Sequence, residues 1–269
     1  MPHIEHYKDL VDKVYCEDSF TLLRNLEYPS FDLTFTSPPY YNARDYSVYE
    51  SYGDYLDIMT DIFKEVHRTT KDGRFLVVNT SPVIVPRKNR QDQSRRLPIP
   101  FDLNTRLVDM GWMFMEDIVW LKPEPSVKNR VASFDQHRKP LAYKPNCVTE
   151  FLMVYRKKTD KLIDSIYKQY SKEALEESKI EDGYESTNVW AISPVRDKDH
   201  SAVFPISLCD KVIKYYSFKN DLVLDPFAGS GSVGISALQN NRHFTLIEKN
   251  KQYFKNITKK LYKWKNTQL

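Results

Sequence analysis

Side chains that can act on an amino group follow a predicted strand. The apolar run Phe31–Phe35 predicts a buried strand. The residues that follow it are Thr36, Ser37, Pro38, Pro39 and Tyr40. Proline has no backbone N–H, so this turn leaves carbonyl acceptors without adding donors. The Ser37 hydroxyl and a free carbonyl can accept from an NH2 group, while the Tyr40 ring stacks on a flat ligand. A proline turn that merely closes a strand is the alternative interpretation.

A second segment has the layout of a nucleotide-binding turn. Leu222–Leu224 predicts a short strand, and residues 233–238 have helical character. Three of the chain's seven glycines, Gly229, Gly231 and Gly234, have the spacing G-x-G-x-x-G, which alone is weak evidence. Glu248 ends the next predicted strand, Phe244–Ile247, where an acid can hold the two hydroxyls of a ribose.

Together these segments resemble the S-adenosylmethionine-dependent DNA methyltransferases that modify an exocyclic amine, either N4 of cytosine or N6 of adenine. Here Ser-Pro-Pro-Tyr precedes Asp-Pro-Phe-Ala-Gly-Ser-Gly, an order similar to the β group of that family. Three further segments are similar to parts of the family core, namely Val14–Asp18, Gly111–Pro123 and His200–Pro205. The resemblance therefore covers most of the chain.

The resemblance implies a catalytic role for the proline turn. Ser37 Oγ and the Pro38 carbonyl would orient the N–H bonds of the amine, Pro39 would stiffen the turn, and Tyr40 would stack on the base. The base would be flipped out of the duplex, with no metal and no covalent enzyme intermediate. The implied cofactor is S-adenosylmethionine, and its expected contacts are Asp18, Thr36, His200, Phe204, Asp225, Pro226, Phe227, Ala228, Gly229, Ser230, Gly231, Ser232, Glu248 and Lys249. For Asp18, capping of the following helix is an equally simple role.

Regular elements alternate along the chain. The expected strands are Val14–Cys16, Phe31–Phe35, Phe75–Val78, Ile118–Leu121, Phe151–Tyr155, Leu222–Leu224 and Phe244–Ile247. The expected helices are Ser19–Leu26, Tyr55–Arg68 with Asp54 as its cap, Asp102–Met110, Pro205–Tyr216, Val233–Asn240 and Lys251–Lys263. This pattern predicts an α/β fold with a mostly parallel, Rossmann-like sheet of seven strands and helices on both faces.

The predicted organisation is permuted. The glycine unit comes late, with too little chain after it to build a sheet, so its strand must join strands of the N-terminal part. We expect a catalytic part over 1–158, a small target-recognition insert over 159–195, and a cofactor-binding part over 196–269. A plain surface excursion is the alternative for the insert.

Basic side chains lie in segments predicted to be loops. The expected contacts to DNA phosphates are Arg44, Arg87, Lys88, Arg90, Arg95, Arg96, Lys128, Arg130, Arg138 and Lys139. Solvated surface is the alternative for each of them. A net charge of +4 permits nucleic-acid binding without demanding it.

Composition and cysteine positions restrict the class of protein and the chemistry that the sequence can support. The 269 residues are 41% hydrophobic, without a long apolar run or a signal peptide, which predicts a soluble, cytoplasmic protein. The family resemblance implies that a bacterium, archaeon or phage encodes it. Cys16, Cys147 and Cys209 are expected to be small buried side chains. Since all three lie away from the proline turn, methylation of cytosine at carbon 5, which needs a nucleophilic cysteine, is disfavoured.

Several alternatives stay open. Ser-Pro-Pro-Tyr is typical of cytosine-N4 enzymes of the resembled family, and we favour that target over adenine N6. An RNA or protein amide methyltransferase, a nicotinamide-dependent oxidoreductase and a DNA-binding module with an inactive core are more distant. The expected partners are double-stranded DNA and a cognate restriction endonuclease, with the protein a monomer or homodimer.

Overall fold

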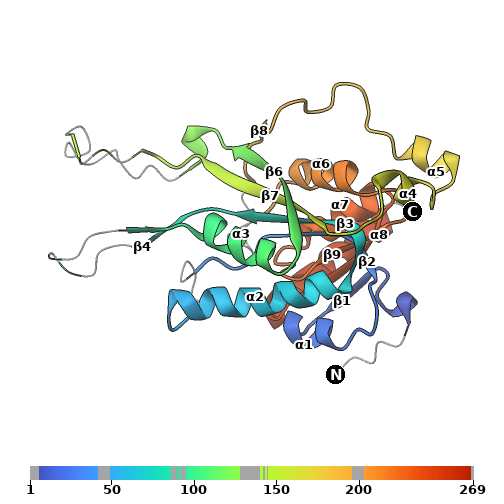
Figure 1. Ribbon diagram of the computed structural model, residues 1–269, viewed down its shortest axis with the longest axis horizontal. Coiled ribbons are helices and arrows are strands. Elements are labelled where there is room, and N and C mark those ends of the chain that lie inside the picture. The colour runs from blue at the N-terminus through green and yellow to red at the C-terminus, as the bar shows by residue number, and fades with distance from the viewer. Residues whose placement is uncertain are drawn as a thin grey trace.

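The computed structural model describes residues 6–41, 49–85, 89, 91, 95–127, 140–141, 143, 145–195 and 203–267. A central sheet of eight strands in the order β1-β10-β9-β2-β3-β7-β6-β8 organises this part of the chain (Figure 1). The strands are β1 (Lys13–Tyr15), β2 (Phe31–Thr36), β3 (Thr70–Thr80), β6 (Trp112–Leu121), β7 (Thr149–Lys157), β8 (Val189–Ala191), β9 (Leu222–Asp225) and β10 (His243–Ile247).

The strand directions confirm a mostly parallel sheet. The strands β1, β10, β9, β2 and β3 are parallel to one another, and β7 lies antiparallel between β3 and β6. The prediction of seven strands was one too few, because β8 adds an eighth at the edge, parallel to β6. The late glycine unit joins the N-terminal part as expected, since β9 pairs with β2.

Helices cover both faces of the sheet. One apolar layer packs beneath α1 (Ser19–Arg24), α2 (Tyr52–Thr69) and α3 (Ile99–Asp109). The other lies beneath α6 (Ile206–Tyr216), α7 (Ser232–Gln239) and α8 (Lys251–Thr267). Because side chains of a strand alternate between faces, Leu222 and Leu224 belong to the first layer and Val223 to the second. Every residue of β2 is buried, which fixes the turn that follows it.

Helix caps fix two of the predicted boundaries. Asp18 caps α1, its carboxylate accepting from the backbone N–H of Thr21 at 3.2 Å. The prediction that Asp54 caps α2 was wrong, because α2 begins at Tyr52 and Ser51 Oγ accepts from the backbone N–H of Asp54 at 3.1 Å. Asp54 thus lies in the first helical turn, where its negative charge interacts favourably with the positive end of the helix dipole.

A two-stranded ribbon replaces part of a predicted loop. Arg95 and Arg96 were predicted to lie in a loop, but β4 (Val83–Val85) and β5 (Arg95–Leu97) pair antiparallel. The ribbon follows β3 beyond Thr80, and so extends from the same edge of the sheet as the end of β2. The strands are only three residues long, too short for a periodic pattern to predict.

The two edges of the sheet are distinguished by strand direction. We call the edge where β2, β3, β9 and β10 end the carboxyl edge, and the opposite edge the amino edge. The short helices α4 (Ile163–Tyr167) and α5 (Lys172–Glu177) lie toward the amino edge, on the right of Figure 1, together with the end of β7. The middle of the segment 159–195 therefore lies away from the proline turn, whereas β8 ends at the carboxyl edge beside Leu121.

A buried ionic cluster holds that segment at the amino edge. The Arg74 guanidinium pairs with Asp32 at 3.1 Å and Asp221 at 3.3 Å, and it donates to the Tyr170 hydroxyl, which in turn donates to Asp221. Lys71 adds a second cation, 2.9 Å from Asp32. Each buried charge has an opposite partner, as burial of charge requires.

None of the described helices combines the length and apolar character needed to cross a bilayer.

Candidate active site

The two sequence motifs meet at the carboxyl edge. Thr36 ends β2 and Asp225 ends the neighbouring strand β9. Thr36 Oγ1 donates to Asp225 Oδ1 at 2.7 Å, across 189 positions of sequence. The turn Ser37–Tyr40 therefore begins directly beside the glycine turn, in the crevice where open α/β sheets bind ligands.

Asp225 is a buried carboxyl group without a cationic partner in the part of the chain that the structure describes. Burial raises its pKa to about 7, opposed by hydrogen bonds from Thr36 and the backbone N–H of Phe227, while the negative charge of Glu248 raises it further. A group that changes charge near neutral pH so easily is typical of a functional site.

The glycine turn brings backbone close to where a ligand would lie. Gly229 has φ +52° and Gly231 has φ +77°, a left-handed conformation that glycine adopts without strain. A Cβ on Gly231 would lie 3.0 Å from Ile257 Cγ2, and a Cβ on Gly234 would lie 2.7 Å from Leu246 Cδ1. The first two glycines therefore shape the turn, and the third lets α7 pack tightly on β10.

Glu248 lies across this turn. Its two carboxylate oxygens accept from the backbone N–H of Gly229 at 2.8 Å and of Asn250 at 2.7 Å. Burial raises its pKa. Each oxygen keeps a lone pair, because a carboxylate offers about four acceptor sites. The oriented carboxylate fits a pair of hydroxyl donors such as those of a ribose.

Other predicted cofactor residues gather around the same turn. The Ser19 hydroxyl donates to the Pro226 carbonyl, Lys249 Nζ lies 3.1 Å from Asp18 Oδ2, and the Phe204 ring stacks on Phe35 at 4.9 Å between centroids. Ala228 and Ser232 are buried, and Ser230 Oγ lies 3.0 Å from Ser232 Oγ. His200 lies outside the described residues.

Tyr40 reaches a charged pair that the sequence prediction did not include. Its hydroxyl donates to Glu150 Oε2 at 3.2 Å, and Glu150 also pairs with Lys122. Glu150 is on β7, the strand next to β3, and Lys122 follows β6, the strand after that. No local pattern could have joined Tyr40 to a residue 110 positions away.

The nearby aromatic side chains belong to the core. The Tyr41 ring contacts those of Tyr49, Tyr52 and Tyr55 at 5.6–6.3 Å between centroids. Residues 42–48, which follow Tyr41, lie outside the described residues.

Few of the predicted DNA contacts can be located. Arg95 and Arg96 are exposed on β5. The other predicted contacts lie outside the described residues: Arg44, Arg87, Lys88, Arg90, Lys128, Arg130, Arg138 and Lys139.

The cysteine prediction was right for one of three. Cys209 is buried, and burial raises the pKa of its thiol. Cys16 and Cys147 are exposed, because Cys16 follows β1 and Cys147 precedes β7, outside the apolar layers.

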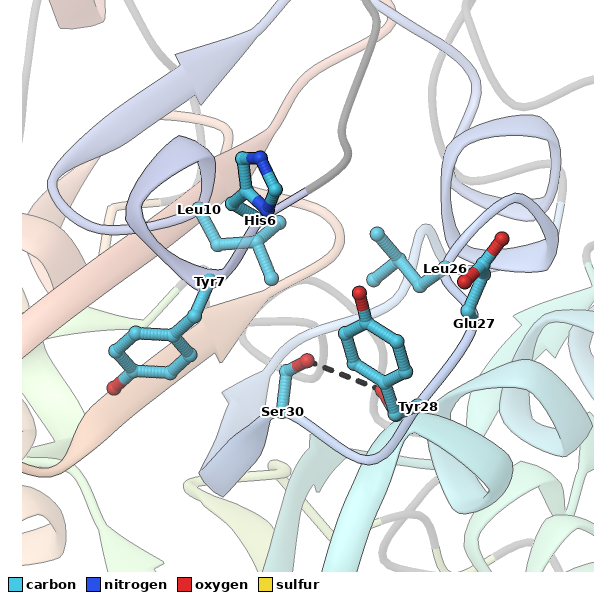
Figure 2. A pocket seen from close by; sticks show the side chains of 7 residues that line it. All are labelled: His6, Tyr7, Leu10, Leu26, Glu27, Tyr28 and Ser30. Atoms are coloured by element: carbon cyan, nitrogen blue, oxygen red, sulfur yellow. Dashed lines mark hydrogen bonds between the residues drawn. The ribbon is translucent and has the colours of Figure 1, made fainter.

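A surface hollow at the amino edge is separate from these residues. Figure 2 shows Tyr7, Leu26 and Tyr28 around it, with Ser30 Oγ donating to the Tyr28 carbonyl at 3.1 Å. Ser30 immediately precedes β2, so the hollow lies at the opposite end of that strand from Ser37.

A family comparison agrees with this geometry. The family described as DNA methylase, of the N6/N4 type, matches residues 31–260, from the start of β2 into α8. The chain belongs to this family. Its glycine turn, Asp225 and oriented Glu248 carboxylate fit the S-adenosylmethionine that the sequence resemblance implies.

Curated relatives of this N6/N4 methylase are type II methyltransferases. M.Cfr9I of Citrobacter freundii is 31% identical over 270 residues, covering 88% of this chain and 83% of its own. M.MwoI of Methanothermobacter wolfeii is 28% identical over 262 residues, covering 92% of this chain but only 34% of its own length. The methylase thus spans most of one relative and about a third of the other.

Solved structures share the fold. TTHA0409 of Thermus thermophilus, a DNA modification methylase complexed with S-adenosyl-L-methionine, has a TM-score of 0.76 at 24% identity and 94% coverage of both chains. The cytosine-N4-specific PvuII DNA methyltransferase has a TM-score of 0.66 at 20% identity, covering 94% of this chain and 90% of its own.

Proposed function

We propose that this methylase transfers a methyl group to the exocyclic amine of a flipped base in double-stranded DNA, with cytosine N4 as the target and adenine N6 as the alternative. The carrying observation is the hydrogen bond from Thr36 to Asp225, because it sets the Ser-Pro-Pro-Tyr turn beside the glycine turn. Two reactants held at adjacent turns react as one bound pair, which removes much of the entropic barrier.

The chain's own groups act on the amine. S-adenosylmethionine, when bound, supplies an activated methyl group. Ser37 Oγ and the Pro38 carbonyl accept from the two N–H bonds, which turns the nitrogen lone pair toward the methyl donor and stabilises the positive charge developing on nitrogen. Pro39 keeps the turn rigid and the Tyr40 ring stacks on the base. Asp225 and Glu248 lie on the cofactor side of the same edge.

The choice of cytosine rests on the motif. Serine before Pro-Pro-Tyr is typical of cytosine-N4 enzymes, as the sequence resemblance implies. The fold does not choose between bases, so the likeness to the cytosine-N4-specific PvuII enzyme adds nothing to this point.

We place the DNA along the carboxyl edge. The ribbon of β4 and β5 extends from this edge and exposes Arg95 and Arg96, which can contact phosphates. The predicted phosphate contacts that lie outside the described residues are included in this proposal on the basis of the sequence alone. Of the segment 159–195, the part from β8 onward reaches the carboxyl edge, so we assign target recognition to that part rather than to α4 and α5.

The biological setting follows from the relatives' names. Because they are type II methyltransferases, we propose a restriction-modification role with a cognate endonuclease.

Nucleoside analysis tests the proposal. The protein is incubated with methyl-labelled S-adenosylmethionine and site-rich genomic DNA, and digested nucleosides are separated by mass spectrometry. Labelled N4-methylcytosine is expected, and N6-methyladenine would move the target to the alternative base. Absence of any labelled nucleoside, with cofactor binding intact, would sink the DNA-methylation proposal.

A further inference from the structure

Glu150 connects the predicted base-stacking residue to a lysine on a different strand. Glu150 Oε2 accepts from the Tyr40 hydroxyl at 3.2 Å, while Glu150 Oε1 pairs with Lys122 Nζ. The three residues come from the turn after β2, the start of β7 and the end of β6. The ring that would stack on the base is therefore hydrogen-bonded through its hydroxyl to β7, two strands away from β2.

The pair is largely withdrawn from solvent. The side chains of Lys122 and Glu150 are 15% and 18% exposed, and Lys122 Nζ lies 4.2 Å from the Trp120 ring centroid. An ion pair in such surroundings is screened less than one on the surface. The cation over the indole face gains a further electrostatic contact. Glu150 is thus held in place through the carboxylate oxygen that Tyr40 does not use.

The protonation state of Tyr40 suits this arrangement. Burial, followed by the negative charge of Glu150, raises the pKa of the phenol well above its usual range. Tyr40 therefore stays a neutral donor throughout the physiological range. The hydroxyl bond anchors the tip of the ring, so the side chain is held in the position from which its face can stack on a base.

We propose that Glu150, held by Lys122, is a positioning residue that fixes the Tyr40 ring for the flipped base. This inference rests on the proposed DNA methylation. It assigns part of the preference of the site for a flat base to Glu150 and Lys122, which lie outside the proline turn and the glycine turn. Glu150 acts through Tyr40, since its side-chain partners among the described residues are Tyr40 and Lys122 rather than residues of the glycine turn.

The chain offers a matched control. Lys211 pairs with Glu185 and lies 5.5 Å from the Trp190 ring centroid, so this trio repeats the chemistry of Lys122, Glu150 and Trp120. Its two side chains are 30% and 31% exposed, and Lys211 lies on α6 rather than at the proline turn. Loss of the ion pair itself should therefore affect both trios, whereas loss of ring positioning should affect only the first.

The test combines Glu150→Gln, Tyr40→Phe and the double variant, using DNA that the wild-type protein methylates. Glu150→Gln keeps the shape of the side chain but breaks the ion pair with Lys122. We expect kcat/KM for DNA to fall about 10- to 100-fold, because small misplacement of a reacting group has effects of this size. The Kd of S-adenosylmethionine should not change. Glu185→Gln should leave kcat/KM within about twofold of wild type.

A double-mutant cycle decides between positioning and stability. If Glu150 acts through the Tyr40 hydroxyl, Glu150→Gln costs little in the Tyr40→Phe background. An equal loss in both backgrounds, or an equal loss for Glu185→Gln, would overturn the inference. Should Glu150→Gln not fold, Lys122→Arg is expected to retain activity and Lys122→Gln to lose it. Failure of the proposed function is distinguished by the wild type, which would then methylate no DNA.

Discussion

The two edges of the central sheet both bury carboxylates, and they satisfy them differently. At the amino edge, Asp32 and Asp221 pair with Arg74, and Lys71 and Tyr170 complete the cluster. At the carboxyl edge, Asp225 and Glu248 accept hydrogen bonds but form no ion pair with the described residues. Saturated carboxylates hold the sheet together, while carboxylates with spare acceptor capacity are available to a ligand. Burial raises the pKa at both edges, of Asp221 as well as of Asp225 and Glu248, so it is the missing ion pair that distinguishes the carboxyl edge.

Removing the cation at the amino edge should have the largest effect on stability. Arg74→Met leaves Asp221 buried without its cation and Asp32 with only Lys71. We expect the free energy of unfolding to fall by about 3–5 kcal/mol, since an uncompensated charge stays buried. Urea denaturation measures this. The control is Lys64→Met, where the Lys64 and Asp61 side chains are 59% and 57% exposed, and it should cost less than about 1 kcal/mol. Equal midpoints for both variants would contradict this account of the amino edge.

Ser37→Ala, at the carboxyl edge, should have the opposite result: it should lower activity and leave stability nearly unchanged. Loss of one acceptor for the amine should lower kcat about 10²- to 10³-fold, equivalent to about 2.7–4 kcal/mol in the barrier. The unfolding midpoint should stay close to that of the wild type, because Ser37 is only partly buried. Methyl transfer and urea denaturation of the same preparation measure both quantities. A variant with wild-type kcat would remove Ser37 from the mechanism.

Gly234→Ala tests whether the glycine turn at the carboxyl edge depends on tight packing of α7 against β10. The added Cβ would lie 2.7 Å from Leu246 Cδ1, so α7 must move away from β10. We expect a loss of about 1–3 kcal/mol in stability together with weaker cofactor binding. The matched variant is Gly53→Ala in α2, where the nearest atom would be Ser51 Oγ at 3.5 Å. Gly53→Ala should be neutral or stabilising, by up to about 1 kcal/mol. Thermal unfolding and isothermal titration compare the two.

The smallest expected effect is the pH dependence of cofactor binding. Without cofactor, Asp225 has a pKa of about 7, so it carries its proton at lower pH. A bound sulfonium cation favours the ionised form, so binding below pH 7 must release this proton. Affinity should therefore increase as pH rises toward 7, by at most about tenfold per unit, and level off above it.

Calorimetry tests this linkage. Titrations below pH 7 in two buffers of different ionisation enthalpy should show proton release, and Asp225→Asn should abolish it. In the cofactor-free protein the sign for stability is opposite. The native state holds a proton that the unfolded state has lost between about pH 4 and 7, so Asp225 contributes less stability as pH rises through that window.

Local sequence predicted the parts of the fold whose signal is local. The apolar runs at Phe31–Phe35 and Leu222–Leu224 and the glycine turn between β9 and α7 all have the predicted character. Strand β8 has only three residues and gives no periodic pattern, so it was missed. The start of α2 was misplaced because Ser51 and Asp54 are both good caps, and only the geometry selects Ser51.

Contacts between distant residues set the limit of prediction at the candidate site. The turn at Thr36 could be expected to meet Asp225, because the motif order implied one shared sheet. Glu150 carried no such signal, since nothing near it in the sequence suggests a partner at Tyr40. Likewise, the amino-edge location of α4 and α5 depends on Tyr170 reaching Asp221, 51 positions away.

The pairing of β2 with β9 also has a consequence for how the protein is made. Leu33 pairs with Val223, so the middle of the sheet joins the beginning of the chain to a strand synthesised some 190 residues later. Closing so long a loop is entropically costly and slows folding. While the ribosome is still translating, the apolar strand β2 waits with one edge unpaired, a form that chaperones bind. The turn at Ser37–Tyr40 therefore has no neighbour from the glycine turn until Asp225 has left the exit tunnel, so the candidate site is completed only late in synthesis.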